Sequence, residues 1–283
     1  MSCGTFWFEV SATLALIKDT FREAFARKIF WGLFGLSTAM ILFFLFLLNI
    51  DIVEGAVATV TLFGKPVRRV GDVEKWVRGT YAAIATFLYT WDMLLAVFAS
   101  AGLTPSILEP GRIELLLSKP VSRVQILLGR YTGNVLVVSC NIVYLVLGVW
   151  LILGVKTGIW TGSFLYSIVT TIFVFAILLT VVVLIGVLFE SAALAIMVTV
   201  ALMVMSPILA QTATMLKLLS SEWSRDVWRT LYYTLPKVWD MGRLTLDLIQ
   251  KNPVAPLMPI WTSALFGAIV LGVAALAFQR RDF

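Results

Sequence analysis

The stretch Glu109–Gly129, EPGRIELLLSKPVSRVQILLG, separates two long apolar runs, and the rest of the chain is organised around it. Pro110 suits the first position of a helix, where its missing N–H costs nothing. Pro120 disfavours the α conformation at the residue before it and ends that helix. Ser122, with Gln125 three residues later, is a capping-box pattern that starts a new helix. The stretch predicts a short helix, a break and a second helix; on spacing alone, a capped loop is an equal alternative.

The composition identifies an integral membrane protein. Of the 283 residues, 60% are hydrophobic and 13% are charged, against about 25% charged in soluble domains. The net charge of +6 suits contact with anionic lipid headgroups, and the basic residues are too scattered to indicate nucleic acid. Histidine is absent, which excludes histidine metal ligands and Ser-His catalysis and argues against a membrane-embedded enzyme.

Six apolar runs are long enough to cross a hydrocarbon core of about 30 Å. We expect the spans at residues 29–50, 80–103, 131–154, 164–189, 192–211 and 259–278. Residues 1–283 are therefore expected to form one all-α transmembrane domain with both termini on the same side. Lysine and arginine are divided almost evenly between the two sides, so the positive-inside rule does not assign the orientation.

The N-terminal residues, about 9–28, predict an amphipathic helix in the membrane interface. Its apolar face is formed by Val10, Leu14, Ile17, Phe21 and Phe25, and Lys18, Asp19, Arg22 and Glu23 lie off that face. A plain extension of the first span is the alternative. The first apolar run is too long and begins too late for a cleaved signal peptide.

Two segments between spans carry weaker signals. Residues 57–63 are rich in β-branched side chains and precede Gly64-Lys65-Pro66, which indicates a small hairpin outside the membrane. Residues 212–258 are rich in tryptophan and tyrosine, which favour the headgroup level. They predict one or two interfacial helices broken at Pro236, with an ordinary surface loop as the alternative.

Asp92 is the charged residue that falls well inside a predicted span. A carboxylate at the centre of a spanning helix costs about 2.5–3.5 kcal/mol, so it needs water, a proton or a polar partner such as Asn141. Asp92 and Asn141 are therefore candidates for a translocation path, and a structural hydrogen bond between spans is an equal alternative. Cys140, inside an apolar run, is expected to be a small core residue.

The central stretch resembles the ABC type-2 permeases, the membrane subunits of ATP-driven transporters. The matching positions are Glu109, Gly111, Glu114-Leu115-Leu116-Leu117-Ser118, Pro120-Val121-Ser122-Arg123 and Leu128-Gly129-Arg130. Arg112 departs from the family's usual Thr after the Gly. The layout of six spans, Leu235-Pro236 and the Arg-Arg-Asp-Phe ending resemble the branch that includes the nitrous-oxide-reductase maturation permease.

The resemblance implies that residues 109–130 are cytoplasmic and that Pro110–Ser118 is a coupling helix seated in a groove of the ATPase. It also implies that the N-terminal helix is an interfacial elbow and that the turn at Glu190-Ser191 is a second cytoplasmic contact. The implied coupling interface consists of Glu109, Gly111, Arg112, Glu114, Leu117, Lys119, Pro120, Ser122, Arg123 and Glu190.

The resemblance further implies a bacterial or archaeal cytoplasmic membrane, cytoplasmic termini and export as the direction of transport. Two separately encoded ATPase chains would hold ATP and Mg, with no cofactor on this chain and no Walker A pattern in its sequence. A second permease chain, expected to be an identical copy, and an extracytoplasmic accessory protein are further expected partners. A non-transporting scaffold or maturation factor that works with an ATPase is the main alternative.

Overall fold

The computed structural model describes residues 3–26, 28–47, 49–53, 57–62, 65–70, 73–102, 122–253 and 257–281. The long helices are α1 (Cys3–Ala26), α2 (Lys28–Leu47), α3 (Val73–Ala101), α5 (Arg123–Thr157), α6 (Tyr166–Phe189), α7 (Ala192–Ala210) and α11 (Met258–Gln279). The shorter elements are the 3-10 turn η2 (Gly162–Leu165) and helices α8 (Thr212–Leu218), α9 (Glu222–Thr234) and α10 (Val238–Gln250).

Within the described ranges, five helices are long and apolar enough to cross a membrane: α3, α5, η2 with α6, α7 and α11. A sixth span is obtained if the end of α1 and α2 are counted together, as a pair bent by 70°. The predicted helical membrane protein is therefore confirmed, and the predicted six spans are reached if this bent pair is one span.

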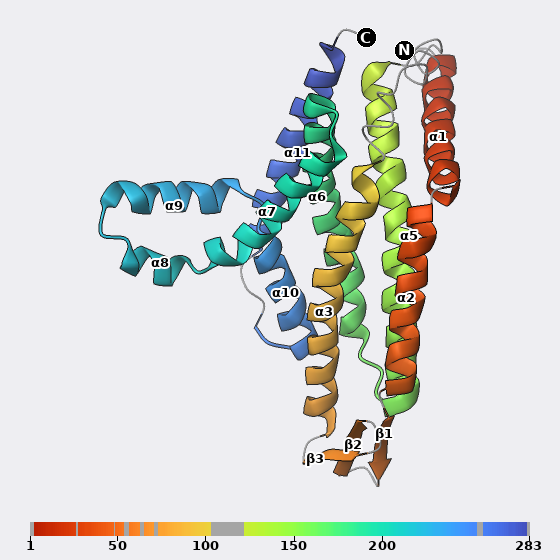
Figure 1. Ribbon diagram of the computed structural model, residues 1–283, viewed down its shortest axis with the longest axis vertical. Helices are drawn as coiled ribbons and strands as arrows, with labels where there is room; N and C mark the ends of the chain where they lie inside the picture. Colours follow the sequence, from red (N-terminus) through yellow and green to blue (C-terminus); the bar gives the residue numbers. More distant parts are fainter. Residues whose placement is uncertain are drawn as a thin grey trace.

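Helix α6 is the centre of the bundle, in contact with α3, α5, α7, α10 and α11 (Figure 1). Its sequence is apolar on all sides, which is typical of a helix surrounded by other helices. Phe175, Leu178 and Val182 are fully buried there. The spans are therefore held together mainly by side-chain packing around one central helix.

Helix α5 has 35 residues, so it is about 52 Å long and extends beyond the apolar run at both ends. Helices α1 and α2 both lie along it (Figure 1). In α2, Phe34 stacks on Tyr144 with ring centroids 4.5 Å apart, and the ammonium group of Lys156 donates to the carbonyl of Leu45. The span predicted at 131–154 is thus longer, because its polar first turns continue the same helix.

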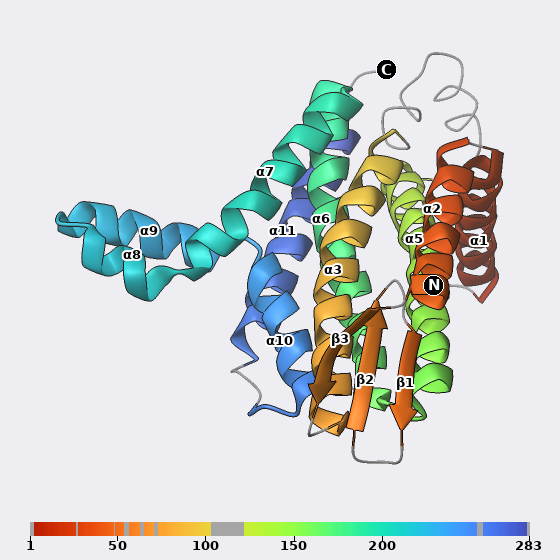
Figure 2. The same ribbon diagram turned by 60° about the horizontal axis from the view of Figure 1, so that its bottom comes forward.

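A small antiparallel sheet lies at one end of the bundle, between α2 and α3 (Figure 2). Its strands are β1 (Asn49–Val53), β2 (Val57–Leu62) and β3 (Lys65–Val70), in the order β1-β2-β3. The structure contains the expected hairpin, as β2 and β3. The prediction that the first span reaches residue 50 is wrong, because Asn49 and Ile50 pair with Thr61 and Val60 in the sheet.

Helices α8 and α9 form an arm that projects sideways from the bundle in both views (Figures 1 and 2). Helix α9 has no buried residue, and Trp223, Val227 and Leu231 are exposed on one side of it. The helix ends before Pro236, and α10 begins at Val238 and packs back onto α3, α6 and α7. The predicted break at Pro236 is confirmed.

Other boundaries differ by a few residues. Helix α3 starts at Val73 and not near residue 80, since its charged first turns are helical although they are not apolar. Cys140 is exposed on α5 and is not a core residue. In a membrane protein the outside of the bundle is also apolar, so an apolar run does not distinguish the core from the lipid-facing side.

Candidate functional site

Much of the predicted coupling interface lies outside the described residues. This applies to Glu109, Gly111, Arg112, Glu114, Leu117, Lys119 and Pro120. The structure does describe Ser122, Arg123 and Glu190, together with the end of α3 and the start of α5 on either side of the segment.

The start of α5 has the predicted cap. Ser122 is extended (φ −68°, ψ 148°), and its hydroxyl oxygen accepts the backbone N–H of Gln125 at 3.2 Å. A serine cap satisfies one of the free N–H groups of the first turn. The direction in which α5 leaves the central segment is therefore fixed at its first residue.

Arg123 and Glu190 come together through the end of the chain. The guanidinium of Arg123 donates to the carbonyl oxygen of Arg281 at 2.5 Å, and the guanidinium of Arg281 donates to Glu190 and to the carbonyl of Val187. Glu190 has the left-handed conformation (φ 53°) that ends α6, and Ser191 caps α7 by accepting the N–H of Leu194. The predicted tight turn between α6 and α7 is confirmed, and Arg281 connects it to the start of α5 and the end of α11.

An ion-pair cluster that the sequence did not predict connects α1 to α5. Arg130 is only 6% exposed, and its guanidinium donates to Asp19 at 2.7 Å and to Glu23. Asp19 and Glu23 are four residues apart, so they lie on the same face of α1. The available signal was this acidic pair together with the arginine of the Leu128-Gly129-Arg130 motif.

Two glycines bring α1 and α5 close together beside this cluster. A Cβ on Gly129 would lie 3.0 Å from Leu16 Cβ, and one on Gly133 would lie 2.7 Å from Thr20 Cβ. Small residues permit this close approach of helices in membranes. We call this contact the α1–α5 seam, formed by Leu16, Asp19, Thr20, Glu23, Gly129, Arg130 and Gly133.

The two candidate path residues do not pair with each other. The amide group of Asn141 donates to Ser37 Oγ at 3.1 Å, so Asn141 joins α5 to α2. Asp92 is 4% exposed and lies on the same side of α3 as Leu88 and Ala96, which are both buried. The proposed hydrogen bond between Asp92 and Asn141 is wrong, because the two residues belong to different helix contacts.

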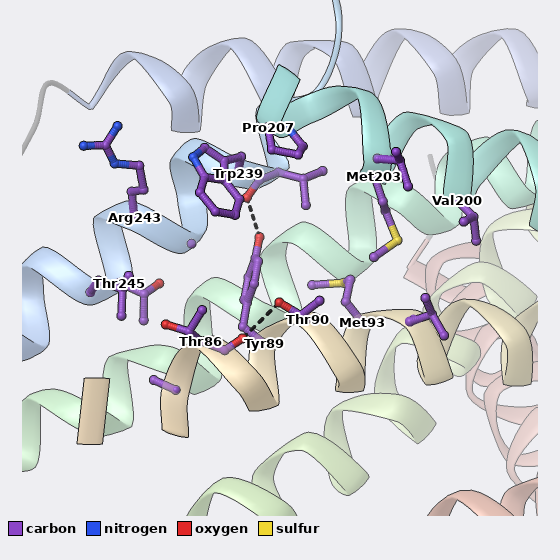
Figure 3. Close-up of a pocket in the computed structure, with 16 residues that line it drawn as sticks. Thr86, Tyr89, Thr90, Met93, Val200, Met203, Pro207, Trp239, Arg243 and Thr245 are labelled. Carbon is purple, nitrogen blue, oxygen red and sulfur yellow. Dashed lines mark hydrogen bonds between the residues drawn. The ribbon is translucent and has the colours of Figure 1, made fainter. Parts of the chain in front are cut away.

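A lateral cavity of about 320 Å³ lies between α3, α7 and α10 (Figure 3). That volume is at the lower end of the range for small-molecule sites, about 300–1,000 Å³. Most of its wall is apolar, with Met93, Met203 and Trp239 among the lining residues. Asp92 is not part of the lining. Sequence reasoning missed this site because it is assembled from three helices that are distant in the chain.

A buried lysine connects the arm to the bundle. Lys237 is 3% exposed; its ammonium group donates to Thr262 Oγ1 at 3.2 Å and lies 4.5 Å from the centre of the Tyr232 ring. Burial lowers the pKa of Lys237, and the nearby Asp240 carboxylate partly opposes that shift. Burial, together with the hydrogen bond that Tyr232 donates to Asp240 at 2.9 Å, raises the pKa of Tyr232.

We expect the stability of this joint to increase with pH. Because the pKa of Lys237 is lower in the folded protein than the usual 10.5, the unfolded chain binds more protons as pH rises through the folded value. The slope is at most about 1.4 kcal/mol per pH unit for one group. The thermal unfolding midpoint of the protein in lipid nanodiscs should rise from neutral pH to about pH 9.5. The series ends at about pH 9.5 because Tyr232 ionises in the unfolded chain at higher pH.

The control is Lys237→Met, which keeps an unbranched side chain of similar length and removes the titrating group. The rise in midpoint over this pH range should be smaller in the variant than in the unmodified protein. Equal slopes in the two proteins would show that Lys237 does not titrate differently on unfolding.

These features together define a multi-pass helical membrane protein, with a cluster of polar contacts at the end of the bundle where α3 ends and α5 begins. Comparison with family models matches residues 14–283 to the ABC-2 family transporter proteins. The chain belongs to this family, whose members are permease subunits that work with an ATPase. A search of curated proteins gives no match.

Proposed function

We propose that this chain is the membrane subunit of an ATP-driven exporter and that it couples transport to ATP hydrolysis on a separate ATPase chain. The observation that carries the proposal is the family match over residues 14–283, which includes the whole central segment. In this proposal Pro110–Ser118 is the coupling helix, and its surface binds in a groove of the ATPase. The termini are then cytoplasmic and the sheet β1–β3 is extracytoplasmic.

The contacts around Ser122 support this role for the segment. A movement of the coupling helix is transmitted to α5 through the first turn of that helix. This turn is held in place because Ser122 caps it and Arg123 donates to the backbone at the end of α11. The α1–α5 seam then joins the same region to α1. In this proposal, ATP binding on the partner moves the whole end of the bundle as a unit between two states.

Two copies of the chain with two ATPase chains complete the proposed transporter. The α8–α9 arm supports pairing of two copies, because it projects from its own bundle and leaves Trp223, Leu218 and Tyr233 exposed. The arm also carries charged side chains such as Arg225 and Asp226, which are poorly suited to lipid. Contact with a second bundle would cover both kinds of side chain.

Affinity purification of the tagged chain in mild detergent tests the proposal. We expect an ATPase to copurify in equal amounts, and ATP-dependent flux after reconstitution of the complex. A copurifying ATPase without flux would favour the alternative of a scaffold or maturation factor, the role that likeness to the nitrous-oxide-reductase maturation branch suggests. Purification of the chain with no ATPase would contradict the proposal.

Asp92 is proposed to act on the translocation path and not only in packing. Asp92→Asn keeps the size of the side chain, so the variant should fold normally. Loss of the acid should reduce ATP-driven flux by roughly tenfold, which corresponds to about 1.4 kcal/mol in the transport barrier. The measurement is flux at equal amounts of assembled complex. Unchanged flux and substrate range would assign Asp92 to packing alone.

A further inference from the structure

The walls of the cavity between α3, α7 and α10 are mostly apolar, and their hydroxyl groups offer no free hydrogen-bond donor. The hydroxyl hydrogens of its walls are already donated within the protein, from Thr86 to the carbonyl of Ala82, from Thr90 to that of Thr86, and from Tyr89 to that of Val238. The hydroxyl of Thr245 donates to Thr170 or to the carbonyl of Met241. A ligand in the interior is therefore bound by apolar contact.

The remaining lining is built from flexible or flat apolar side chains. Met93 and Met203 face each other across the cavity, and Trp239 lies above Tyr89 (Figure 3). Methionine adapts to the shape of a chain because its side chain is unbranched and polarisable. Pro207 interrupts the backbone bonding of α7 beside the cavity. Such a wall suits an alkyl chain better than a polar or rigidly shaped ligand.

One charged group, Arg243, lines the cavity. It lies on α10 one turn after Trp239, and its side chain is exposed. The acidic residues on the same helix are used elsewhere: Asp240 accepts a hydrogen bond from Tyr232, and Asp247 accepts one from Asn252. Among the described residues, the structure gives Arg243 no ion pair. Its guanidinium is a planar donor that matches carboxylate and phosphate groups.

We propose that this cavity binds an amphiphilic anion, with its hydrocarbon chain between Met93, Met203 and Trp239 and its anionic group on Arg243. Binding of the anion needs this chain alone. That the bound anion is a transported cargo rests on the proposed transport function. The recognised chemistry is shared by free fatty acids and by anionic phospholipids. Neutral amphiphiles of the same chain length bind more weakly because they lack the ion pair.

Photolabelling of the protein in neutral-lipid nanodiscs tests this binding without an ATPase. The probes are dodecanoic acid with a diazirine in the middle of its chain, the matching alcohol, and phosphatidylglycerol and phosphatidylcholine with the same group in one chain. We expect the acid to label peptides of α3, α7 and α10 more than the alcohol does. The phosphatidylglycerol arm decides whether an intact anionic lipid also enters.

Arg243→Gln should reduce labelling by the anionic probes by up to about fivefold, the upper end of what one exposed ion pair supplies, and leave labelling by the alcohol unchanged. Arg229→Gln is the matched control, since Arg229 lies on α9, away from the cavity. A second variant, Val200→Phe, fills the cavity and should reduce labelling by every probe. The proposal is overturned if the acid and the alcohol label equally, or if Arg229→Gln has the same effect as Arg243→Gln.

This experiment separates the two claims. Selective labelling by an anion without copurification of an ATPase would retain the binding site and remove the transport function. An assembled, active transporter with no selective labelling would retain the function and remove the site.

Discussion

Replacement of Arg130 by glutamine is expected to destabilise the protein by about 3–5 kcal/mol, the usual cost of removing one partner of a buried ion pair. Arg130 is 6% exposed and Glu23 is 11% exposed, so neither charge is well solvated. Without the guanidinium, Asp19 and Glu23 remain as two neighbouring negative charges at the α1–α5 seam. The measurement is the thermal unfolding midpoint in nanodiscs, with ATPase stimulation measured in the assembled complex.

Two controls make the Arg130 result specific. Arg22→Gln removes a positive charge from an exposed position of α1 and should change the midpoint little. The triple variant Asp19→Asn, Glu23→Gln, Arg130→Gln removes all three charges of the cluster and should recover much of the loss. If the triple variant is as unstable as Arg130→Gln alone, the ion-pair explanation is wrong.

Gly133→Ala is expected to force α1 away from α5 and to cost about 1–3 kcal/mol, as overpacking usually does. The new Cβ would lie 2.7 Å from Thr20 Cβ. Thr20 cannot turn away easily, because the contact atom is its Cβ and its hydroxyl donates to the carbonyl of Leu16 at 2.9 Å. The unfolding midpoint should fall, and proteolysis at the end of α1 should become faster.

Gly272→Ala on α11 is the matched control, since a Cβ there would meet nothing within 4 Å. Because alanine has a higher helix propensity than glycine, this variant should be as stable as the unmodified protein or up to about 1 kcal/mol more stable. A similar loss in both variants would mean that glycine itself, and not the close contact at the seam, determines the effect.

The spans and caps were predictable because they depend on local chemistry. Long apolar runs gave the six predicted spans, and the spacing of Ser122 and Gln125 gave the start of α5. Asn49 and Ile50 were wrongly assigned to the first span, because a single Asn followed by Ile does not interrupt an apolar run, whereas in the structure these two residues begin β1. Element ends in a membrane protein are therefore predicted less well than element centres.

The α1–α5 seam shows why the contacts were harder to predict. Asp19 and Glu23 lie off the apolar face of α1, and on a soluble surface this would indicate exposure to solvent. In the structure the acidic pair binds Arg130, and Leu14 and Phe25 are 60% and 49% exposed. In lipid an apolar face does not need a protein partner, so amphipathicity alone does not determine which face packs.

The cavity could not be predicted for a different reason. More than a hundred residues separate Tyr89 from Met203, and helices α8 and α9 lie between Met203 and Arg243 in the chain. In the sequence, each of these side chains is what any membrane helix or interfacial helix contains. Only the packing of α10 against α3 and α7 brings them together. Similarly, the bond of Arg281 to Glu190 depends on α6 and α11 running side by side in the same direction.

The most direct test of the coupling account is the accessibility of position 112. The variant Arg112→Cys, made with Cys3→Ser and Cys140→Ala, is treated with a membrane-impermeant maleimide in oriented membranes, with and without the copurifying ATPase. We expect labelling from the cytoplasmic side alone and protection when the ATPase is bound. Labelling from the opposite side, or equal labelling with and without the ATPase, would contradict the placement of the coupling helix.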